Sequence, residues 1–212
     1  IFGVPIGILT AVFMAYYCPK KIYKPLKAAT ELLAGIPSVV YGFFGLVVIV
    51  PLIRTLGRDL GFGGNGSSIL TASLLLGMMI LPTIIGLTES SIRAVPDQYY
   101  EGAVALGATH ERAIFRVVIP AAKSGVIAAI VLGVGRAIGE TMAVIMVAGN
   151  QARLPQGIFR GVRTLTANIV IEMGYATGLH REALIATGVV LFVFILIINL
   201  AFSIIKGKGE KE

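Results

Sequence analysis

Long apolar runs separated by short polar segments dominate the chain. Five such runs cover residues 1–17, 36–53, 68–88, 121–148 and 183–205. Crossing the hydrocarbon layer of a bilayer takes about 20 mostly apolar residues in a helix. Because backbone N–H and C=O groups cannot remain unpaired in hydrocarbon, runs of this kind form helices. The pattern predicts an all-α membrane protein, a polytopic bundle of five spans in which one transmembrane domain fills the whole chain.

The composition also indicates a membrane protein. Hydrophobic residues make up 56% of the chain and charged residues only 14%, and the mean hydropathy is +0.89. Soluble domains carry about 25% charged residues. The first apolar run begins at Ile1, without a methionine, so we expect at least one further span upstream of this sequence. Cys18 is the single cysteine of the sequence, so no disulfide can form within the chain.

Residues 101–120 form a charged, helix-prone segment between two apolar runs, so they must leave the bilayer and fold at its surface. Pro96 and Asp97 suit the start of a helix, because proline lacks an N–H that the first position does not need and aspartate favours the positive helix N-terminus. Gly107 is expected to end that helix and Thr109 to cap a second one. The sequence therefore predicts two short helices joined by a bend, which project as a knob.

Lysine and arginine indicate which way the chain threads. With residues 101–120 placed in the cytoplasm, alternate threading puts residues 20–27 and the solvated tail from Lys206 inside, and residues 57–67 and 149–182 outside. More Lys and Arg then lie inside than outside, as cytoplasmic loops require. The net charge of +7 is thus a topology signal, and nucleic acid is not expected as a partner.

Two charged residues lie within the fourth apolar run. At about 1.5 Å per residue, Arg136 and Glu140 fall near or beyond the middle of the bilayer. Their spacing places both on one helix face, where they can neutralise each other. Gly135 and Gly139 would let a neighbouring helix approach closely. Ionisable groups at this depth mark a substrate path or an internal ion pair. We expect a translocation path at Arg136, Glu140 and Thr141; a purely structural salt bridge remains the alternative.

Several other polar residues suggest ordinary structural roles. Residues 23–34 resemble a short interfacial helix, in which Lys27 and Glu31 would pair. Glu89, at the inner end of the third run, is expected to be a solvated or snorkelling end residue. His110 and His180 are far apart in sequence and lack metal-ligand spacing, so no metal site is expected.

Neither of the two common nucleotide-binding motifs is supported in this sequence. The pattern Gly61-x-Gly63-x-x-Gly66 formally matches a dinucleotide fingerprint, but between two membrane helices it is expected to be a flexible turn. The sequence Gly-x-x-x-x-Gly-Lys-Ser/Thr is absent, so the chain has no phosphate loop for ATP and no cofactor is expected.

Arg160 and Arg163 would meet an outer partner or an arriving anion, or else be plain loop charges.

The surface segment has the order of a known motif. Glu-x-Ala, a glycine four residues later and an aliphatic-x-aliphatic-Pro ending fall on Glu101, Ala103, Gly107, Val117, Ile119 and Pro120. This order resembles the signature loop of ABC importer permeases, which docks on a separate ATPase. By this resemblance Glu101, Ala103, Gly107, Ala108 and Pro120 belong to the ATPase-coupling loop. Gly102, where the signature has Ala, is a departure that loosens the helix slightly.

Other segments are similar to one branch of that family. Residues 34–45, 135–144, 162–169 and 172–175 resemble permeases of phosphate-specific ABC importers. The order Met142-Ala-Val after Glu-Thr is similar to the C-type subunit of that system. Nearly the whole chain takes part in the resemblance.

The resemblance implies a function and a set of partners. The chain would be a permease subunit that carries inorganic phosphate across the inner or plasma membrane, with the coupling loop and C-terminus in the cytoplasm. A second permease subunit, two cytoplasmic ATPase subunits and an extracytoplasmic phosphate-binding protein would complete the importer. ATP hydrolysis would belong to the ATPases, so this subunit would not be an enzyme.

Other functions are less well supported by the residues. A permease for a different solute, such as molybdate or sulfate, is the close alternative, since selectivity can reside in the outer binding protein. An intramembrane enzyme would need a nucleophile–base pair or a metal cluster, which the sequence does not offer. A non-transporting scaffold would give no reason for Arg136 and Glu140.

Overall fold

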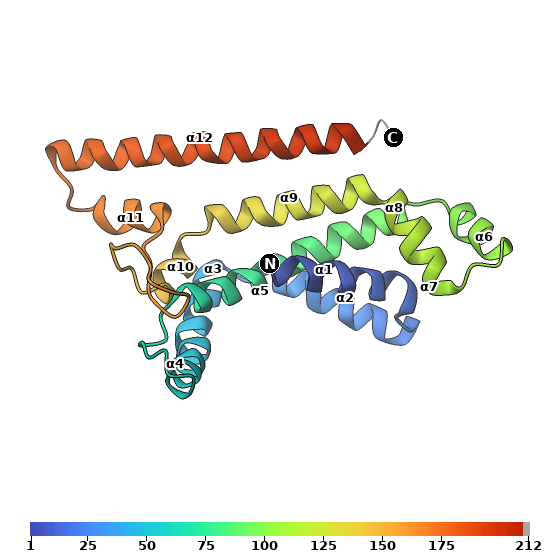
Figure 1. Ribbon diagram of the computed structural model, residues 1–212, viewed down its shortest axis with the longest axis horizontal. Coiled ribbons are helices and arrows are strands. Elements are labelled where there is room, and N and C mark those ends of the chain that lie inside the picture. The colour runs from blue at the N-terminus through green and yellow to red at the C-terminus, as the bar shows by residue number, and fades with distance from the viewer. Residues whose placement is uncertain (210–212) are drawn as a thin grey trace. The chain divides into compact units, whose positions relative to one another are not determined.

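The computed structural model describes residues 1–209, and helices account for most of them (Figure 1). Within the described residues the one β contact is an isolated bridge between Gly149 and Val162. The all-α fold class expected from the apolar runs is confirmed. The chain divides into two compact units, the first formed by residues 1–34, 80–134 and the end of the chain, and the second by residues 35–79 and 135–198.

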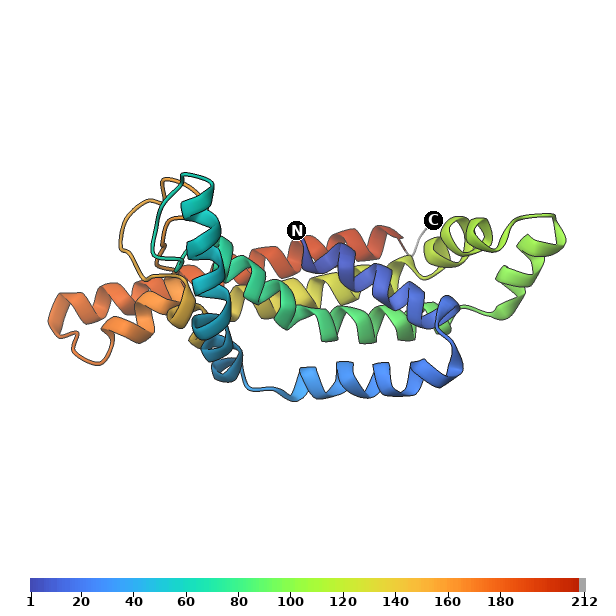
Figure 2. The ribbon, with the colours of Figure 1, turned by 90° about the horizontal axis from the view of Figure 1, so that it is seen from below.

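The first unit contains the N-terminal helices and the predicted surface segment. Its elements are α1 (Gly3–Val12), a π-helical turn (Phe13–Tyr17), α2 (Lys20–Gly35), the second half of α5 (Ile69–Arg93), α6 (Asp97–Ala105), α7 (His110–Ala113), a π-helical turn (Ile114–Val118), α8 (Ile119–Ala121) and most of α9 (Lys123–Gly139). In both views α6 and α7 lie beyond the ends of α1 and α9 (Figures 1 and 2).

An apolar cluster joins the elements of the first unit. Val12 from α1, Ile92 from α5 and Val126 from α9 are buried together with Ile114 and Val118 of the second π-helical turn. Removing such side chains from water is worth about 1.5–3 kcal/mol each. The end of α1, the end of α5 and the segment after α7 therefore share one core.

The second unit is built around a different apolar cluster. Its elements are α3 (Ser38–Phe44), a π-helical turn (Gly45–Ile49), α4 (Val50–Asp59), the first half of α5, the end of α9, α10 (Met142–Val147), α11 (Leu165–Glu172) and most of α12 (Gly178–Gly209). Figure 2 shows α3 and α4 as parts of one continuous helical run.

Close packing in the second unit depends on glycine. A Cβ atom at Gly42 of α3 would lie 2.7 Å from the sulfur of Met146 and 2.9 Å from the Cα atom of Ala143. Only a glycine lets α3 approach α10 this closely. Leu75 and Val147, both fully buried, fill the core behind this contact.

The number of spans differs from the predicted five. Among the residues that the structure describes, three helices are long and apolar enough to cross a membrane, namely Ser38–Asp59, Ile69–Arg93 and Gly178–Ala201. The pair His110–Ala121 and Lys123–Gly139 would make a fourth, but it bends by 70°. The first apolar run forms only the short helix Gly3–Tyr17.

The boundaries of the last two predicted spans also need correction. The fourth apolar run is not one helix, because α9 ends at Gly139 and α10 begins at Met142. At the other end α12 continues to Gly209, whereas the sequence suggested a solvated tail from Lys206. The last part of that tail, residues 210–212, lies outside the described residues.

The glycine-rich segment after α4 is a loop, as the sequence predicts. Gly61, Gly63 and Gly66 all have positive φ angles, of 75°, 63° and 88°. A Cβ atom at Gly66 would lie 2.1 Å from the carbonyl oxygen of Val50, which no side chain can tolerate. These glycines serve the turn, and no strand precedes them within the described chain.

Candidate functional site: a coupling segment and a broken membrane helix

The predicted surface segment folds as two short helices with a bend. Pro96 precedes α6 in an extended conformation, and Asp97 lies in the first turn of the helix. Gly107 ends α6 with a φ angle of +87°, and its N–H donates to the carbonyl oxygen of Val104 at 2.9 Å. Positive φ is readily adopted only by glycine. The Thr109 hydroxyl accepts from the N–H of Arg112 and caps α7. The predicted start, bend and cap are confirmed.

The bend presents its tip to the surroundings. Glu101 and Gly107 are exposed, and Leu106 is 91% exposed. Ala103 and Ala108 are partly buried, and the N–H of Ala108 donates to the carbonyl oxygen of Ala103 at 3.0 Å. The tip of the bend therefore carries an exposed apolar side chain beside an exposed charged one.

The end of the segment turns the chain into the next long helix. Pro120 is exposed in the first turn of α8. Proline is tolerated there because the N–H that it lacks would have no hydrogen-bond acceptor within the helix. The 70° bend follows directly, between Ala121 and Lys123. A cleft of about 360 Å³ lies at this bend and is lined by Ser91, Ala94, Val95, Pro96, Tyr99, Ala121, Ala122, Ser124 and Gly125.

A cluster of aromatic rings connects the segment to the first helix. The Nδ1 atom of His110 lies 2.8 Å from the hydroxyl of Tyr100. The rings of Tyr16 and Tyr17 lie 6.3 Å and 5.1 Å from the His110 ring, centroid to centroid. His110 was expected to be an ordinary surface residue. Sequence reasoning missed this contact because Tyr16 and Tyr17 lie far before His110 in the sequence, and no local pattern indicates that the two segments meet.

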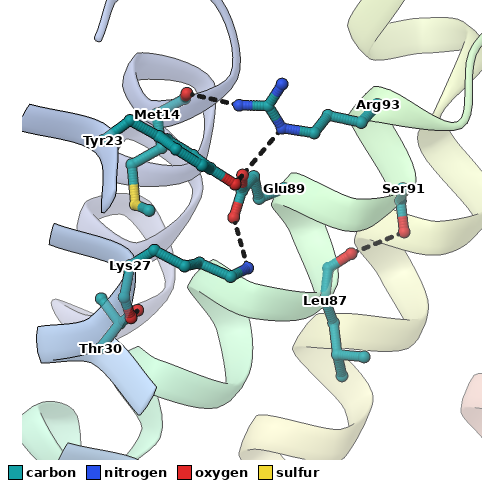
Figure 3. Close-up of polar contacts among 8 residues, drawn as sticks. All are labelled: Met14, Tyr23, Lys27, Thr30, Leu87, Glu89, Ser91 and Arg93. Carbon is teal, nitrogen blue, oxygen red and sulfur yellow. Dashed lines mark hydrogen bonds and ion pairs between the residues drawn. The ribbon is translucent and has the colours of Figure 1, made fainter. Parts of the chain in front are cut away.

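A buried carboxylate is the second feature that the sequence did not reveal. Glu89 is 1% exposed and accepts from the Tyr23 hydroxyl at 2.6 Å, the Lys27 ammonium at 2.7 Å and the Arg93 guanidinium at 2.8 Å (Figure 3). The expectation that Glu89 is solvated is wrong. The predicted pair of Lys27 with Glu31 is also wrong, because α2 turns Lys27 towards α5 and leaves Glu31 exposed. The hydrogen bond to Glu89 raises the pKa of Lys27.

The signal that points to Glu89 is present in the sequence. Glu89 and Arg93 are four residues apart within an otherwise apolar helix, the spacing of a helical ion pair. Ionisable residues within membrane helices usually have a partner. What the sequence could not indicate is that a second helix, α2, supplies Lys27 from 62 residues away.

The charged residues of the fourth apolar run are arranged differently from the prediction. Glu140 lies just past the end of α9, and its Oε1 atom accepts from the backbone N–H groups of Thr141 and Ala143, both at 3.1 Å. Thr141 leaves the helical conformation, and its hydroxyl donates to the carbonyl oxygen of Gly139 at 3.2 Å. Arg136 is exposed on α9. The expected ion pair of Arg136 with Glu140 is absent from the ion pairs of residues 1–209, because the helix that would align them stops between them.

The glycines beside these residues are not in close contact within the described chain. A Cβ atom at Gly135 or Gly139 would meet no heavy atom within 4 Å in the described structure. The small-residue stripe therefore faces open space, and the predicted tight approach of a neighbouring helix is not made by the described part of this chain.

A cavity lies beside the helix break, within the second unit. Its volume is about 250 Å³. The polar side chains that line it are those of Ser73, Glu140, Thr164 and Thr166, among mainly apolar neighbours. The Thr166 hydroxyl also reaches the carbonyl oxygen of Glu140, at 3.4 Å. Irregular backbone at membrane depth is tolerated where it lines a cavity of this kind.

The segment after α10, which the sequence predicts to face outward (residues 149–182, the outer segment), is held by Arg163. Its guanidinium donates to the Glu172 carboxylate at 2.6 Å and to the Asn150 carbonyl oxygen at 3.0 Å. The sequence left open whether Arg163 meets an outer partner or an anion or is a plain loop charge. In the structure its side chain is engaged in contacts within the chain. The Tyr175 hydroxyl donates to Glu172, and this hydrogen bond, together with Arg163, lowers the pKa of Glu172.

No metal site accompanies these features. Across residues 1–209, no three His, Cys, Asp or Glu side chains come together closely enough to hold a metal ion.

Comparison with known families gives a match over almost the entire chain. Residues 3–208 match the model of the binding-protein-dependent transport system inner membrane component.

Curated relatives agree with this match. The probable ABC transporter permease protein YqgH of Bacillus subtilis is 42% identical over 201 residues, which cover 92% of this chain and 64% of that protein. The phosphate transport system permease protein PstC of Mesorhizobium japonicum is 37% identical over 212 residues, covering 92% of this chain and 65% of the relative. The chain thus spans slightly less than two thirds of the length of these relatives.

Solved structures show the same fold at lower identity. The MetNI methionine ABC transporter in an inward-facing conformation matches with a TM-score of 0.74 and 21% identity, covering 98% of this chain and 88% of the other. A bacterial ABC transporter involved in the import of alginate matches with a TM-score of 0.68 and 16% identity, covering 98% of this chain and 73% of the other.

Proposed function

Because the chain belongs to the family of inner membrane components of binding-protein-dependent transport systems, we propose that it is a permease subunit of an ATP-driven importer of inorganic phosphate. The observation that carries this function is the exposed helix pair α6 and α7. Its glycine bend at Gly107 and its exposed leucine at the tip suit a surface that receives movement from a separate ATPase.

The assignment of phosphate rests on the relatives. Several curated proteins at 34–37% identity carry the name phosphate transport system permease protein PstC. No relative cited here is named for molybdate or sulfate, so these solutes are not favoured. The C-type assignment of the subunit has the same support.

The partners follow from this function. A second permease subunit would complete the translocation path, two ATPase subunits would dock on the coupling helices, and an extracytoplasmic phosphate-binding protein would deliver the anion. ATP hydrolysis would take place on the ATPases, since the sequence of this chain has no phosphate loop. In this arrangement α6 and α7 and the C-terminus face the cytoplasm, and residues 149–182 face outward.

The helix break at Glu140 and Thr141 is the proposed location of the path. It places polar side chains and irregular backbone beside a cavity, as in transporters whose substrate sites are formed by discontinuous helices. Arg136, exposed on α9 and not ion-paired within the described chain, would attract the phosphate anion. Glu140, occupied as a helix cap, would shape the path rather than bind an anion that it repels.

One transport experiment tests this function. The chain is expressed with its neighbouring permease, ATPase and binding-protein genes, and the purified complex is placed in vesicles. ATP-dependent uptake of radiolabelled phosphate is expected, with sulfate and molybdate in excess failing to compete. Uptake of sulfate or molybdate in preference to phosphate would contradict the substrate, and uptake without ATP would contradict the class of transporter.

A further inference from the structure

Two sets of side-chain contacts, called joints below, connect helices of the first unit. The first joint lies between α2 and α5. Glu89 of α5 accepts from the Tyr23 hydroxyl at 2.6 Å and from the Lys27 ammonium at 2.7 Å (Figure 3). The Glu89 side chain is 1% exposed, so both contacts are shielded from water on the carboxylate side. Charge-assisted hydrogen bonds of this kind are short and strongly directional. The first half of α2, which carries Tyr23 and Lys27, is therefore fixed to the end of α5.

Arg93 extends the joint to the end of α1. Its Nε atom donates to Glu89 at 2.8 Å, and its Nη2 atom donates to the carbonyl oxygen of Met14 at 3.0 Å. Met14 lies in the π-helical turn that ends the first helix, where the last carbonyl groups lack intrahelical donors. The same guanidinium lies 4.8 Å from the centre of the Tyr23 ring. This one arginine of α5 therefore contacts both the end of the first helix and α2.

His110 forms the second joint, between the end of α1 and the coupling helices. Its Nδ1 atom is 2.8 Å from the Tyr100 hydroxyl of α6, and its ring meets Tyr17 edge to face at 5.1 Å. Tyr16 lies 5.8 Å from the Tyr100 ring. Aromatic contacts in this distance range stabilise beyond the area that they bury. The rings thus connect α6 and α7 to the same turn of α1 that Arg93 holds.

An apolar layer lies beneath both joints. Val12 of α1, Ile92 of α5 and Ile114 after α7 are all buried in one cluster. Close-packed protein interiors have low compressibility and transmit strain. The coupling helices are consequently attached to α1 at two levels, by the rings at the surface and by the apolar cluster below them.

We propose that the end of α1, the first half of α2 and the coupling helices α6 and α7 move as one body during the transport cycle, and that Glu89 and His110 are the positioning residues that hold this body together. The inference rests on the proposed function, since a coupling movement presupposes an ATP-driven permease. It assigns a role to Glu89 and His110, neither of which is a signature position of the coupling loop or part of the proposed translocation path.

A cross-link tests whether the joint at His110 stays closed. Tyr17 and His110 are replaced by cysteine together in a Cys18→Ser background, within the full importer in vesicles. The uncross-linked variant is expected to hydrolyse ATP with reduced phosphate uptake, because the ring contacts are gone. A short thiol-reactive cross-linker should then restore uptake, and it should react equally well in the nucleotide-free and ATP-bound states.

The opposite results would overturn the inference. If the two segments move apart during the cycle, cross-linking will block uptake and depend on nucleotide. If the contact has no role, the cross-link will leave uptake unchanged. Both results require that the Cys18→Ser background itself takes up phosphate, so a failure of the proposed function appears separately, as absence of uptake in that background.

A second variant tests Glu89 independently. Glu89→Gln should leave ATP hydrolysis intact but raise the number of ATP molecules hydrolysed per phosphate transported about fivefold, the range expected for residues that mediate coupling. Glu89→Asp, which keeps the charge, should recover part of the ratio. Glu31→Gln, an exposed change on α2, the helix that supplies Tyr23 and Lys27, is the matched control and should leave the ratio unchanged. An unchanged ratio in Glu89→Gln would overturn the role of Glu89.

Discussion

The Oε1 atom of Glu140 accepts a hydrogen bond from the backbone N–H of Ala143, at 3.1 Å. The same oxygen accepts from the N–H of Thr141, so one carboxylate satisfies two of the unpaired donors at the start of α10. A residue that seemed to be half of an ion pair is therefore a helix cap. The cap explains how the chain breaks a membrane helix here without leaving these donors unsatisfied.

The first prediction concerns this cap. Glu140→Ala should destabilise the protein by about 0.5–2 kcal/mol, the usual cost of losing an N-terminal cap. Glu140→Gln keeps an oxygen acceptor and should cost less. Thermal unfolding of the purified complex measures both. Equal stability of Glu140→Ala and the unmodified protein would mean that the cap is dispensable.

The second prediction separates the two interpretations of Arg136. Because Arg136 and Glu140 do not pair, Arg136→Gln should leave membrane abundance unchanged while phosphate uptake is lost. Adding Glu140→Gln should not restore uptake, since no unpaired charge needs to be neutralised. Uptake and abundance are compared in the single and double variants. Recovery of transport by the double variant would indicate that the two residues do form a structural pair during the cycle.

The third prediction concerns the bend of the coupling helices. Gly107 has a φ angle of +87°, where a residue with a Cβ atom costs about 1–2 kcal/mol. Gly107→Ala should therefore loosen the bend and lower uptake relative to ATP hydrolysis, and Gly107→Glu should uncouple the two further. Gly102→Ala is the control, because a Cβ atom at Gly102 meets nothing within 4 Å and its backbone is helical. Equal effects at both glycines would argue against a role for the backbone angle.

The fourth prediction concerns orientation. In the proposed threading, Lys21 faces the cytoplasm and Leu154 faces outward; both are exposed, Leu154 by 89%. Cysteines at these two positions, in a Cys18→Ser background, should react with an impermeant thiol reagent from opposite sides of sealed vesicles. The Cys18→Ser protein alone reports background labelling. Labelling of both positions from the same side would contradict the threading.

The fifth prediction is a pH dependence in the outer segment. The Tyr175 hydroxyl and Arg163 lower the pKa of Glu172 below its ordinary value of 4.5. A carboxylate of this kind stabilises the folded state above its unfolded pKa, and the contribution is lost as the pH falls through the folded pKa. His180, whose Nε2 atom is 3.8 Å from Glu172, adds attraction when it is protonated. The outer segment should therefore keep its order on mild acidification and lose it only below pH 4.5.

Hydrogen exchange measures this pH dependence. Protection of residues 163–180, corrected for intrinsic exchange rates, should fall below that pH in the unmodified protein. Glu172→Gln should show lower protection at neutral pH and little further change on acidification. A pH dependence that survives in Glu172→Gln would assign the effect to another group.

Local signals predicted the surface segment well. Pro96, Gly107 and Thr109 each act through their own backbone geometry, so the start of α6, the bend and the cap of α7 follow from the sequence. The apolar runs likewise predicted helices and the all-α class. Their lengths were less informative, because hydropathy does not register that Glu140 and Thr141 end a helix inside a continuous apolar run.

The contacts that the sequence did not reveal are all between distant segments. Glu89 is buried by residues 62 and 66 positions away, and no periodicity of α5 or α2 specifies that these helices meet. Helix spacing favoured Glu31 as the partner of Lys27 because local pairs are the ones that a sequence can display. A charged residue within an apolar helix implies a partner, but only packing decides which one.

The contact between Lys27 and Glu89 also has a consequence for biosynthesis. Lys27 leaves the ribosome 62 residues before the carboxylate that neutralises it. Until α5 is made, α2 carries uncompensated lysines that favour the aqueous surface of the membrane over its interior. We therefore expect α2 to remain at the surface while α3 and α4 are synthesised, and to dock only when α5 inserts. The order of assembly then differs from the order of the helices in the chain.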